Sequence, residues 1–340
     1  MNAIQGAEGP DDAPFWRILS IDGGGIKGTF PAAFLATLED DLDRPIGEYF
    51  DLITGTSTGG ILAIGLALGI PAKALLKLYV ERGPFIFGQD GKKADSRTNG
   101  WRQFFRHMVK PKHDADILRA ELKTVLGDRR IGDARQRLLV PAWDADQRSP
   151  YIYKTAHHWR LKTDYRKPAV DAAMATAAAP TYFRRHKTID DVGLLDGGVW
   201  ANNPIALGVV EAVTLLGWPA ERLRILSLGC VDEVYMLDEA PGALGLGLDL
   251  LRLYGDGQSR GALGMAKLLT GHEYEREAIF RYSPVAPKNF FAMDDTRKIE
   301  RLVGLGAGSA RNARTKIEPV FLSLPATPFV PVYTLEKDAV

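Results

Sequence analysis

Short apolar runs alternate with helical apolar stripes along the first part of the chain. Residues 17–21 and 49–53 are short runs of the kind that form buried strands. Between them, the sequence predicts a helix from Thr29 onward. Its apolar stripe consists of Phe34, Leu35, Leu38 and Leu42. The order strand, loop, helix, strand predicts a three-layer α/β/α fold with a central, mostly parallel sheet.

The pattern is less regular further along the chain. Further strands are predicted at 138–143, 151–154 and 224–229, and another runs from Leu194 into Asp196-Gly197-Gly198. The small residues of 169–179 indicate a helix that Pro180 ends, and 241–271 contains two Leu- and Gly-rich helical stretches that could cap the domain. We therefore expect a loose leader over 1–15, a single catalytic domain over 16–324 and a proline-containing tail over 325–340.

Composition narrows the class of protein. The apolar fraction of 46%, the charged fraction of 25% and the net charge of +1 are ordinary for a globular protein and give no reason to expect a nucleic acid partner. The run Ile61–Ile70 is too short to cross a bilayer and is expected to be a buried helix. Cys230 is the single cysteine and cannot form an internal disulfide, and the first residues lack the pattern of a signal peptide. These features predict a cytoplasmic location.

Two glycine-containing loops follow the first two predicted strands. Gly55-Thr56-Ser57-Thr58-Gly59 stands between a strand and a helix, which is the pattern of a nucleophile elbow that presents a serine hydroxyl at the end of a sheet. Upstream, Asp22-Gly23-Gly24-Gly25-Ile26-Lys27-Gly28 could supply free backbone N–H groups to an acyl-transfer oxyanion. The same loop also fits the dinucleotide pattern G-x-G-x-x-G, but no carboxylate ends the second strand to hold a ribose.

The base that would activate Ser57 can be sought among histidines or carboxylates. None of the histidines follows a clear strand in a glycine-rich loop; they are His107, His113, His157, His158, His186 and His272. Asp196, by contrast, ends a predicted strand and is followed by Gly197 and Gly198. Taken alone, Asp196 could equally be a turn-forming residue. No cluster of Cys, His and carboxylates has metal-ligand spacing, so we expect neither a metal nor a cofactor.

Taken together, these motifs resemble the signature of the patatin-like phospholipase family. The order is Asp-Gly-Gly-Gly-x-Lys-Gly at 22–28, Gly-x-Ser-x-Gly at 55–59 and Asp-Gly-Gly at 196–198. The Ala-rich segment 175–183 and the segment 199–204 also resemble that family, so the likeness covers roughly residues 17–229.

The resemblance implies a patatin-like fold and a serine lipid acyl hydrolase that uses a Ser–Asp dyad without histidine. Ser57 would be the nucleophile, Asp196 the base, and the N–H groups of Gly23, Gly24 and Gly25 the oxyanion hole. Lys27 would either hold the loop or meet a headgroup phosphate. The remaining motif residues would support the site; they are Asp22, Gly28, Gly55, Gly59, Gly197 and Gly198.

The resemblance also implies partners. The substrate would be phospholipid at the inner face of a membrane, and the aromatic and basic residues of 100–110 could contact that surface or form an ordinary helix. Some bacterial members of the family act in antiphage defence and are switched on by a cyclic dinucleotide, which here would bind the same domain or a homo-oligomer interface. The basic runs 129–130 and 184–187 could meet phosphates or simply be solvated. Two alternatives remain: a constitutive soluble carboxylesterase, and a non-catalytic storage or binding protein.

Overall fold

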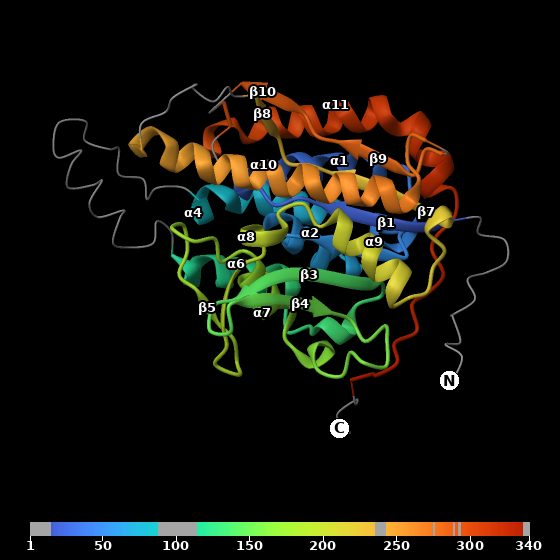
Figure 1. Ribbon diagram of the computed structural model, residues 1–340, viewed down its shortest axis with the longest axis horizontal. Helices are drawn as coiled ribbons and strands as arrows, with labels where there is room; N and C mark the ends of the chain where they lie inside the picture. The colour runs from blue at the N-terminus through green and yellow to red at the C-terminus, as the bar shows by residue number, and fades with distance from the viewer. Residues whose placement is uncertain are drawn as a thin grey trace.

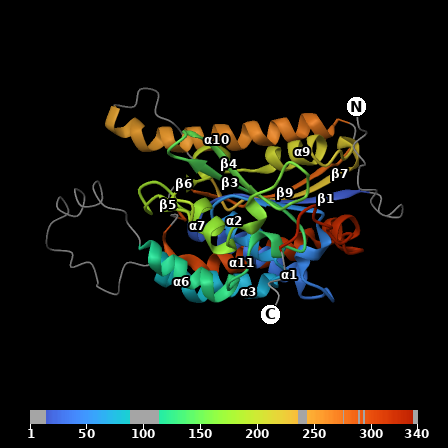
Figure 2. The same ribbon diagram turned by 90° about the horizontal axis from the view of Figure 1, so that it is seen from below.

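The computed structural model describes residues 15–87, 114–234 and 243–335, apart from 275, 288–289 and 292–293. Within these residues a central sheet separates two layers of helices (Figure 1, Figure 2). The order along the sheet is β5-β6-β3-β2-β1-β7-β9, with β4 paired to β3. The strands are β1 (Trp16–Ile21), β2 (Leu52–Gly55), β3 (Arg137–Asp144), β4 (Ser149–Lys154), β5 (His186–Lys187), β6 (Gly193–Asp196), β7 (Leu223–Leu228) and β9 (Ile279–Tyr282).

The centre of the sheet is parallel and one edge is antiparallel. Strands β3, β2, β1, β7 and β9 run parallel to one another, whereas β4, β5 and β6 join by antiparallel pairing. The predicted α/β/α fold with a central, mostly parallel sheet is therefore confirmed, and the antiparallel strands lie at one edge. A second, two-stranded sheet pairs β8 (Asp232–Val234) with β10 (Val285–Pro287).

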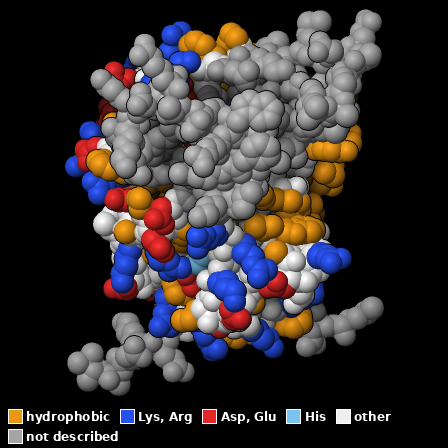
Figure 3. All heavy atoms as spheres, turned by 90° about the vertical axis from the view of Figure 1, so that its left-hand side faces the viewer, with side chains coloured by type: hydrophobic (Ala, Val, Ile, Leu, Met, Phe, Trp, Pro, Cys, Tyr) orange, Lys and Arg blue, Asp and Glu red, His pale blue; other side chains and the backbone are white. Residues whose placement is uncertain are grey.

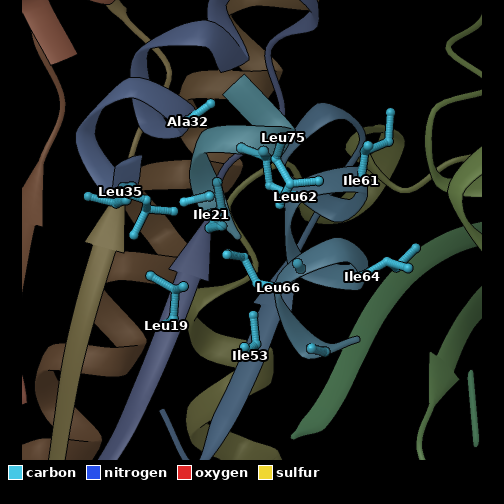
Figure 4. Close-up of a cluster of buried hydrophobic side chains, with 14 of the residues drawn as sticks. Leu19, Ile21, Ala32, Leu35, Ile53, Ile61, Leu62, Ile64, Leu66 and Leu75 are labelled. Carbon is cyan, nitrogen blue, oxygen red and sulfur yellow. The ribbon is translucent and has the colours of Figure 1, made fainter. Parts of the chain in front are cut away.

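Alternate residues of the central strands supply two hydrophobic clusters, one on each face of the sheet. Leu19, Ile21 and Ile53 pack with the helices on one face, as the close-up shows (Figure 4). Ile18 and Leu52 point to the opposite cluster. This alternation follows from the two-residue period of a strand. Because both faces are buried, the strands read as continuous apolar runs in the sequence.

The helices divide between the two faces. On the first face lie α1 (Thr29–Glu39), α2 (Thr58–Ala67), α3 (Ala72–Lys77), α4 (Gly83–Phe87), α6 (Ala115–Leu126), α7 (Ala169–Thr176) and α11 (Ile299–Ile317). On the other lie α9 (Ile205–Thr214) and α10 (Ala243–Thr270), with the short α8 (Gly198–Ala201) in contact with α10. Two shorter elements also matter below: η1 (Gly25–Gly28) and η3 (Leu78–Arg82).

Two sequence-based predictions need correction. The run 49–53 does not begin as a strand, because a 3-10 helix covers Ile46–Tyr49 and β2 starts at Leu52. The segment 241–271 forms one helix, α10, rather than two, and its glycines at 255, 257, 261 and 264 do not interrupt it. The strand predicted to run into Asp196-Gly197-Gly198 is confirmed: β6 ends at Asp196, where the chain turns into α8. No described helix combines the length and the apolar character that a bilayer crossing requires.

Candidate active site

Strand register brings Ser57 and Asp196 to the same level of the sheet. Thr54 of β2 pairs with Leu139 of β3, and three residues further along β3 Ala142 pairs with Asp196 of β6. Ser57 lies three residues beyond Thr54. Strand β6 lies on the other side of β3 from β2 and runs antiparallel to β3. Its last residue, Asp196, therefore lies at the same level of the sheet as Ser57. The sequence predicted Asp196 at a strand end, and the structure supplies the antiparallel pairing that makes this end meet Ser57.

The elbow holds Ser57 in a strained backbone conformation. Its φ of 54° and ψ of −124° lie in a region that non-glycine residues seldom adopt, directly before α2. A side chain at Gly55 would collide with the Gly59 carbonyl, and a side chain at Gly59 would collide with the Ile21 carbonyl. The two glycines therefore permit a turn tight enough to lift Ser57 off the end of β2.

Thr176, at the end of α7, fixes the elbow from a distant part of the chain. The Ser57 N–H donates to Thr176 Oγ1 at 2.9 Å, and the Thr176 hydroxyl donates to the Pro141 carbonyl of β3 at 2.7 Å. Thr176 is fully buried. These hydrogen bonds tie Ser57 to β3, and the Ala-rich motif that includes Thr176 was the only sequence signal for this contact.

Asp196 occupies a site in which its charge is poorly hydrated. The side chain is 4% exposed, and burial raises its pKa to about 7. A side-chain hydrogen bond with Ser57 and the Gly198 N–H, which donates to Oδ1 at 2.6 Å, only partly offset this rise. A carboxyl group with a pKa near neutrality can accept a proton from a neighbouring hydroxyl far better than an ordinary aspartate.

The glycine loop presents two free donors rather than three. The Gly23 N–H donates to the Asn202 carbonyl at 3.0 Å, so the expected oxyanion role of Gly23 is wrong for this conformation. Within the described residues, the N–H groups of Gly24 and Gly25 have no acceptor. Gly25 has φ 59°, which suits glycine at the start of η1. Gly23 itself lies against the elbow, since a Cβ there would come within 3.1 Å of the Ser57 Cβ.

A buried ion pair anchors the glycine loop to the far strands. Asp22, 4% exposed, meets Arg281 of β9 through two contacts, Nη2 to Oδ2 at 2.7 Å and Nη1 to Oδ1 at 3.4 Å. Arg281 Nη1 also donates to Ser227 Oγ of β7 at 2.8 Å. On the other side of the loop, the Cys230 thiol donates to the Asp22 carbonyl at 3.3 Å. Sequence reasoning missed Arg281, because no local pattern marks a contact across about 260 residues.

The other motif residues serve close packing. A side chain at Gly28 would collide with Thr58, and one at Gly197 would collide with the Pro141 carbonyl. Gly198 contributes the N–H bonded to Asp196. Lys27 lies on η1, with Nζ 3.5 Å from the Val231 carbonyl, which is a contact that supports holding the loop.

The described histidines have other roles. His157 contacts Glu211 and Thr155, each at 2.8 Å, and burial lowers its pKa. His272 Nδ1 accepts two backbone N–H groups, from Ala278 and Ile279. His186 lies 3.3 Å from Asp171. His107 and His113, like the 100–110 segment, lie outside the described residues.

An apolar pocket opens beside Ser57. Its floor consists of Gly25, Ser57, Thr58 and Ile61, and its walls are Leu78, Tyr79, Gly83, Ile86, Leu118, Leu122, Ala177, Ala179, Tyr182 and Phe183. These walls come from η3, α4, α6 and the segment after α7. A pocket lined almost wholly by carbon suits a hydrocarbon chain. Its volume of about 40 Å³ holds only about three water molecules, so a long chain could enter only if the walls moved.

Comparison with known proteins agrees with this geometry. A sequence model of the patatin-like phospholipase family matches residues 19–208. A cGAMP-activated phospholipase of Pseudomonas aeruginosa is 40% identical over 222 residues, 64% of this chain and 62% of that protein, so the match spans less than two thirds of the relative. A cGAMP-activated phospholipase of Vibrio cholerae is 34% identical over 71% of each chain.

Among solved structures, VipD from Legionella pneumophila aligns with a TM-score of 0.47 at 12% identity, covering 89% of this chain and 67% of that one.

The match to the family's sequence model covers more than half of the chain and includes the glycine loop, the elbow and Asp196. The chain therefore belongs to the patatin-like phospholipase family.

Proposed function

We propose that this chain is a serine lipid acyl hydrolase that cleaves acyl esters of membrane phospholipids through Ser57 and Asp196. The observation that carries the proposal is the pairing of a strained, buried serine with a carboxyl group whose pKa is raised to about 7. The apolar pocket beside Ser57 supports a fatty acyl chain as the group that is bound.

In the first half of the reaction, Ser57 Oγ attacks the acyl carbonyl carbon while Asp196 takes the hydroxyl proton. The negative charge moves to the carbonyl oxygen, where the free N–H groups of Gly24 and Gly25 can stabilise it. Collapse of this intermediate breaks the ester bond. Asp196 returns the proton to the departing lysophospholipid oxygen, and the acyl group remains on Ser57.

In the second half of the reaction, water attacks the acyl-enzyme by the same series of proton transfers. Asp196 accepts a proton from water as the water oxygen attacks the acyl carbon, and then returns the proton to Ser57 Oγ as the fatty acid leaves. One ester and one water are consumed, and the enzyme recovers its starting protonation state. No step requires a metal ion, a cofactor or a histidine.

We further propose that a cyclic dinucleotide activates the enzyme at the inner face of the membrane. The names of the relatives from Pseudomonas and Vibrio support such an activator. The narrow apolar pocket supports the need for one, because its walls must separate before a long acyl chain can enter. A ligand can drive that change only by binding the open state more tightly than the closed state.

The test is mass spectrometry of lipid products after purified protein meets phosphatidylglycerol vesicles, with and without 3′,3′-cyclic GMP–AMP. We expect lysophospholipid and free fatty acid, strongly increased by the nucleotide and absent with Ser57→Ala protein. If the nucleotide did not change the amount of product, activation would be rejected and the protein would be a constitutive hydrolase. Products that persist in the Ser57→Ala variant would remove the assignment of the nucleophile.

A further inference from the structure

A second cavity, which we call the basic cleft, lies beside the apolar pocket. Its charged and polar lining consists of Arg119, Arg184, Arg185, His186, Lys187 and Asp116, and its volume is about 220 Å³. Arg119 belongs to α6, and the other basic residues belong to β5 and the segment before it. Figure 3 looks onto the side of the molecule that bears these elements, and shows Lys and Arg side chains, with some Asp and Glu among them, in its lower half. The chemistry of the lining favours an anion.

The described acidic residues around the cleft, which include Asp116 in its lining, leave Arg184 without a partner. Arg185 pairs with Asp146 at 3.0 Å, and Lys187 pairs with Asp191 at 2.6 Å, but neither aspartate lines the cleft. Arg184 has no hydrogen-bond or ion-pair partner within the described part of the chain.

Two basic side chains of the lining share one carboxylate, which does not itself line the cleft. Asp171 lies 3.3 Å from Arg119 and 3.3 Å from His186. The atom of His186 that faces Asp171 is Nε2, so this carboxylate serves both basic side chains. An arginine without a partner among the described residues and a second arginine that shares its buried carboxylate with a histidine together form a suitable setting for phosphate oxygens.

The basic cleft and the apolar pocket share a wall. Leu118, Ala177 and Phe183 line both cavities. Two of these wall residues directly precede an arginine that lines the basic cleft: Arg119 follows Leu118, and Arg184 follows Phe183. An anion that draws these two arginines together therefore acts on the same backbone that carries two walls of the apolar pocket.

We propose that the basic cleft is a binding site for a phosphodiester anion and that Arg119 and Arg184 are its principal contacts. The proposal rests on the proposed function, because two phosphodiesters are in question: the headgroup phosphate of the phospholipid substrate and the phosphates of the cyclic dinucleotide. Both carry a single negative charge per phosphate with two exposed oxygens, which a guanidinium group recognises through paired N–H donors.

Because of the shared wall, a lipid headgroup and a cyclic dinucleotide bound in the cleft would have different effects on the apolar pocket. A headgroup in the cleft places the acyl chain of the same lipid against Leu118 and Phe183, so the cleft contributes to substrate affinity. A cyclic dinucleotide in the cleft would shift the walls without entering the pocket, so the cleft contributes to activation. In the second case the two sites are coupled, and the nucleotide and the acyl chain raise each other's affinity.

Binding to Ser57→Ala protein tests the site without hydrolysis. Titration calorimetry would measure three probes: dihexanoyl phosphatidylglycerol, 3′,3′-cyclic GMP–AMP, and dihexanoylglycerol, which lacks the phosphate. Arg119→Gln/Arg184→Gln would then be added to the Ser57→Ala background. The matched control, also in that background, is Arg260→Gln/Arg311→Gln, which removes the same number of positive charges from exposed positions on α10 and α11. Arg184→Lys would test whether a point charge replaces the guanidinium.

We expect Arg119→Gln/Arg184→Gln to lose tenfold or more in affinity for at least one phosphodiester, with dihexanoylglycerol unchanged. Loss for the lipid alone identifies a headgroup site, and loss for the nucleotide alone identifies an activator site. Arg184→Lys should recover only part of the affinity. The proposal is overturned if neither phosphodiester binds, or if Arg119→Gln/Arg184→Gln binds both as the Arg260→Gln/Arg311→Gln control does. Because Ser57 is absent, these results stand apart from whether the wild-type protein hydrolyses phospholipid.

Discussion

The floor of the active site and the walls of its apolar pocket come from different kinds of structural element. In this comparison the floor means the ends of β1, β2 and β6, which carry the glycine loop, Ser57 and Asp196. The Asp22–Arg281 ion pair and the hydrogen bonds of Thr176 hold them in place. The walls are side chains from short helical elements, and they leave about 40 Å³ between them. The contrast suggests that the chemistry is organised in advance, whereas access to it is not.

The largest expected effect comes from the floor, at Asp196. Asp196→Asn should lower kcat on the order of 10³-fold or more, because an amide cannot accept the serine proton. Each histidine change, such as His157→Ala, should do far less. The measurement is steady-state kinetics on a soluble ester. A single histidine variant that loses as much as Asp196→Asn would replace the dyad by a triad.

The same substitution should change the pH dependence of stability. The folded-state pKa of about 7 lies above the ordinary value of 3.8, so the folded protein binds the proton more tightly and loses stability as pH rises from about 4 to 7. At about 1.4 kcal/mol per pKa unit, the loss amounts to roughly 4 kcal/mol. Asp196→Asn should lack this loss, so denaturant unfolding at pH 8 should find the variant more stable than the wild type. Equal stabilities at pH 8 would contradict the raised pKa.

The next effect concerns the free donors of the glycine loop. A Cβ at Gly24 would lie 2.5 Å from the Cys230 Cβ and 2.7 Å from its Sγ, so Gly24→Ala must displace the loop. We expect kcat to fall roughly 10²-fold with little change in KM, because the oxyanion donors act in the transition state. Cys230→Gly in the same protein should restore much of the rate, whereas Cys230→Ala, which keeps the Cβ, should restore less. A change in KM alone would mean that the loop binds substrate instead.

Removing the Asp22–Arg281 ion pair, which anchors the glycine loop, is expected to affect the rate less and the stability strongly. Arg281→Gln leaves Asp22 buried without its cation, which should cost about 3–5 kcal/mol in the free energy of unfolding and lower kcat more than it alters KM. Asp22→Asn combined with Arg281→Gln should recover most of the stability. Chemical denaturation and kinetics on the same samples would check both. A loss of stability with an unchanged kcat would show that the ion pair does not position the donors.

The smallest expected effect comes from the walls and has the opposite sign. Phe183→Ala removes a side chain that narrows the pocket, so basal turnover of long-chain phospholipid should rise severalfold even though the protein loses stability. Phe321→Ala is the control: its ring packs on Phe50 and Phe280 outside the pocket, and it should lower stability without raising turnover. If Phe183→Ala did not raise turnover, the walls would not limit access.

The sequence predicted the floor far better than the walls, and the reason is physical. Local signals marked Ser57 and the glycine loop, since a tight turn after a buried strand requires small residues in a fixed order. The partners of these residues are long-range contacts: Thr176, Asn202 and Arg281 come from separate elements, and their roles depend on strand order that no local pattern encodes. The engagement of Gly23 by Asn202 could not be foreseen for the same reason.

The walls were hardly visible in the sequence. Leu118, Tyr182 and Phe183 read as ordinary apolar residues, and only the tertiary fold brings them around Ser57. The error over 241–271 has a local cause. Its glycines suggested breaks, yet packing against α9 and α8 keeps α10 continuous, so tertiary contacts outweigh the low helix propensity of glycine.

The most direct test of the Ser57–Asp196 dyad is the rate at which a fluorophosphonate probe labels the protein between pH 5 and pH 9, with the modified residue mapped by mass spectrometry. The probe reports activation of the nucleophile and does not depend on the choice of lipid. We predict that Ser57 is labelled, that the rate rises through an apparent pKa of about 7, and that Asp196→Asn protein reacts slowly with no such rise. Labelling at another residue, or the same profile in the Asp196→Asn variant, would contradict the dyad.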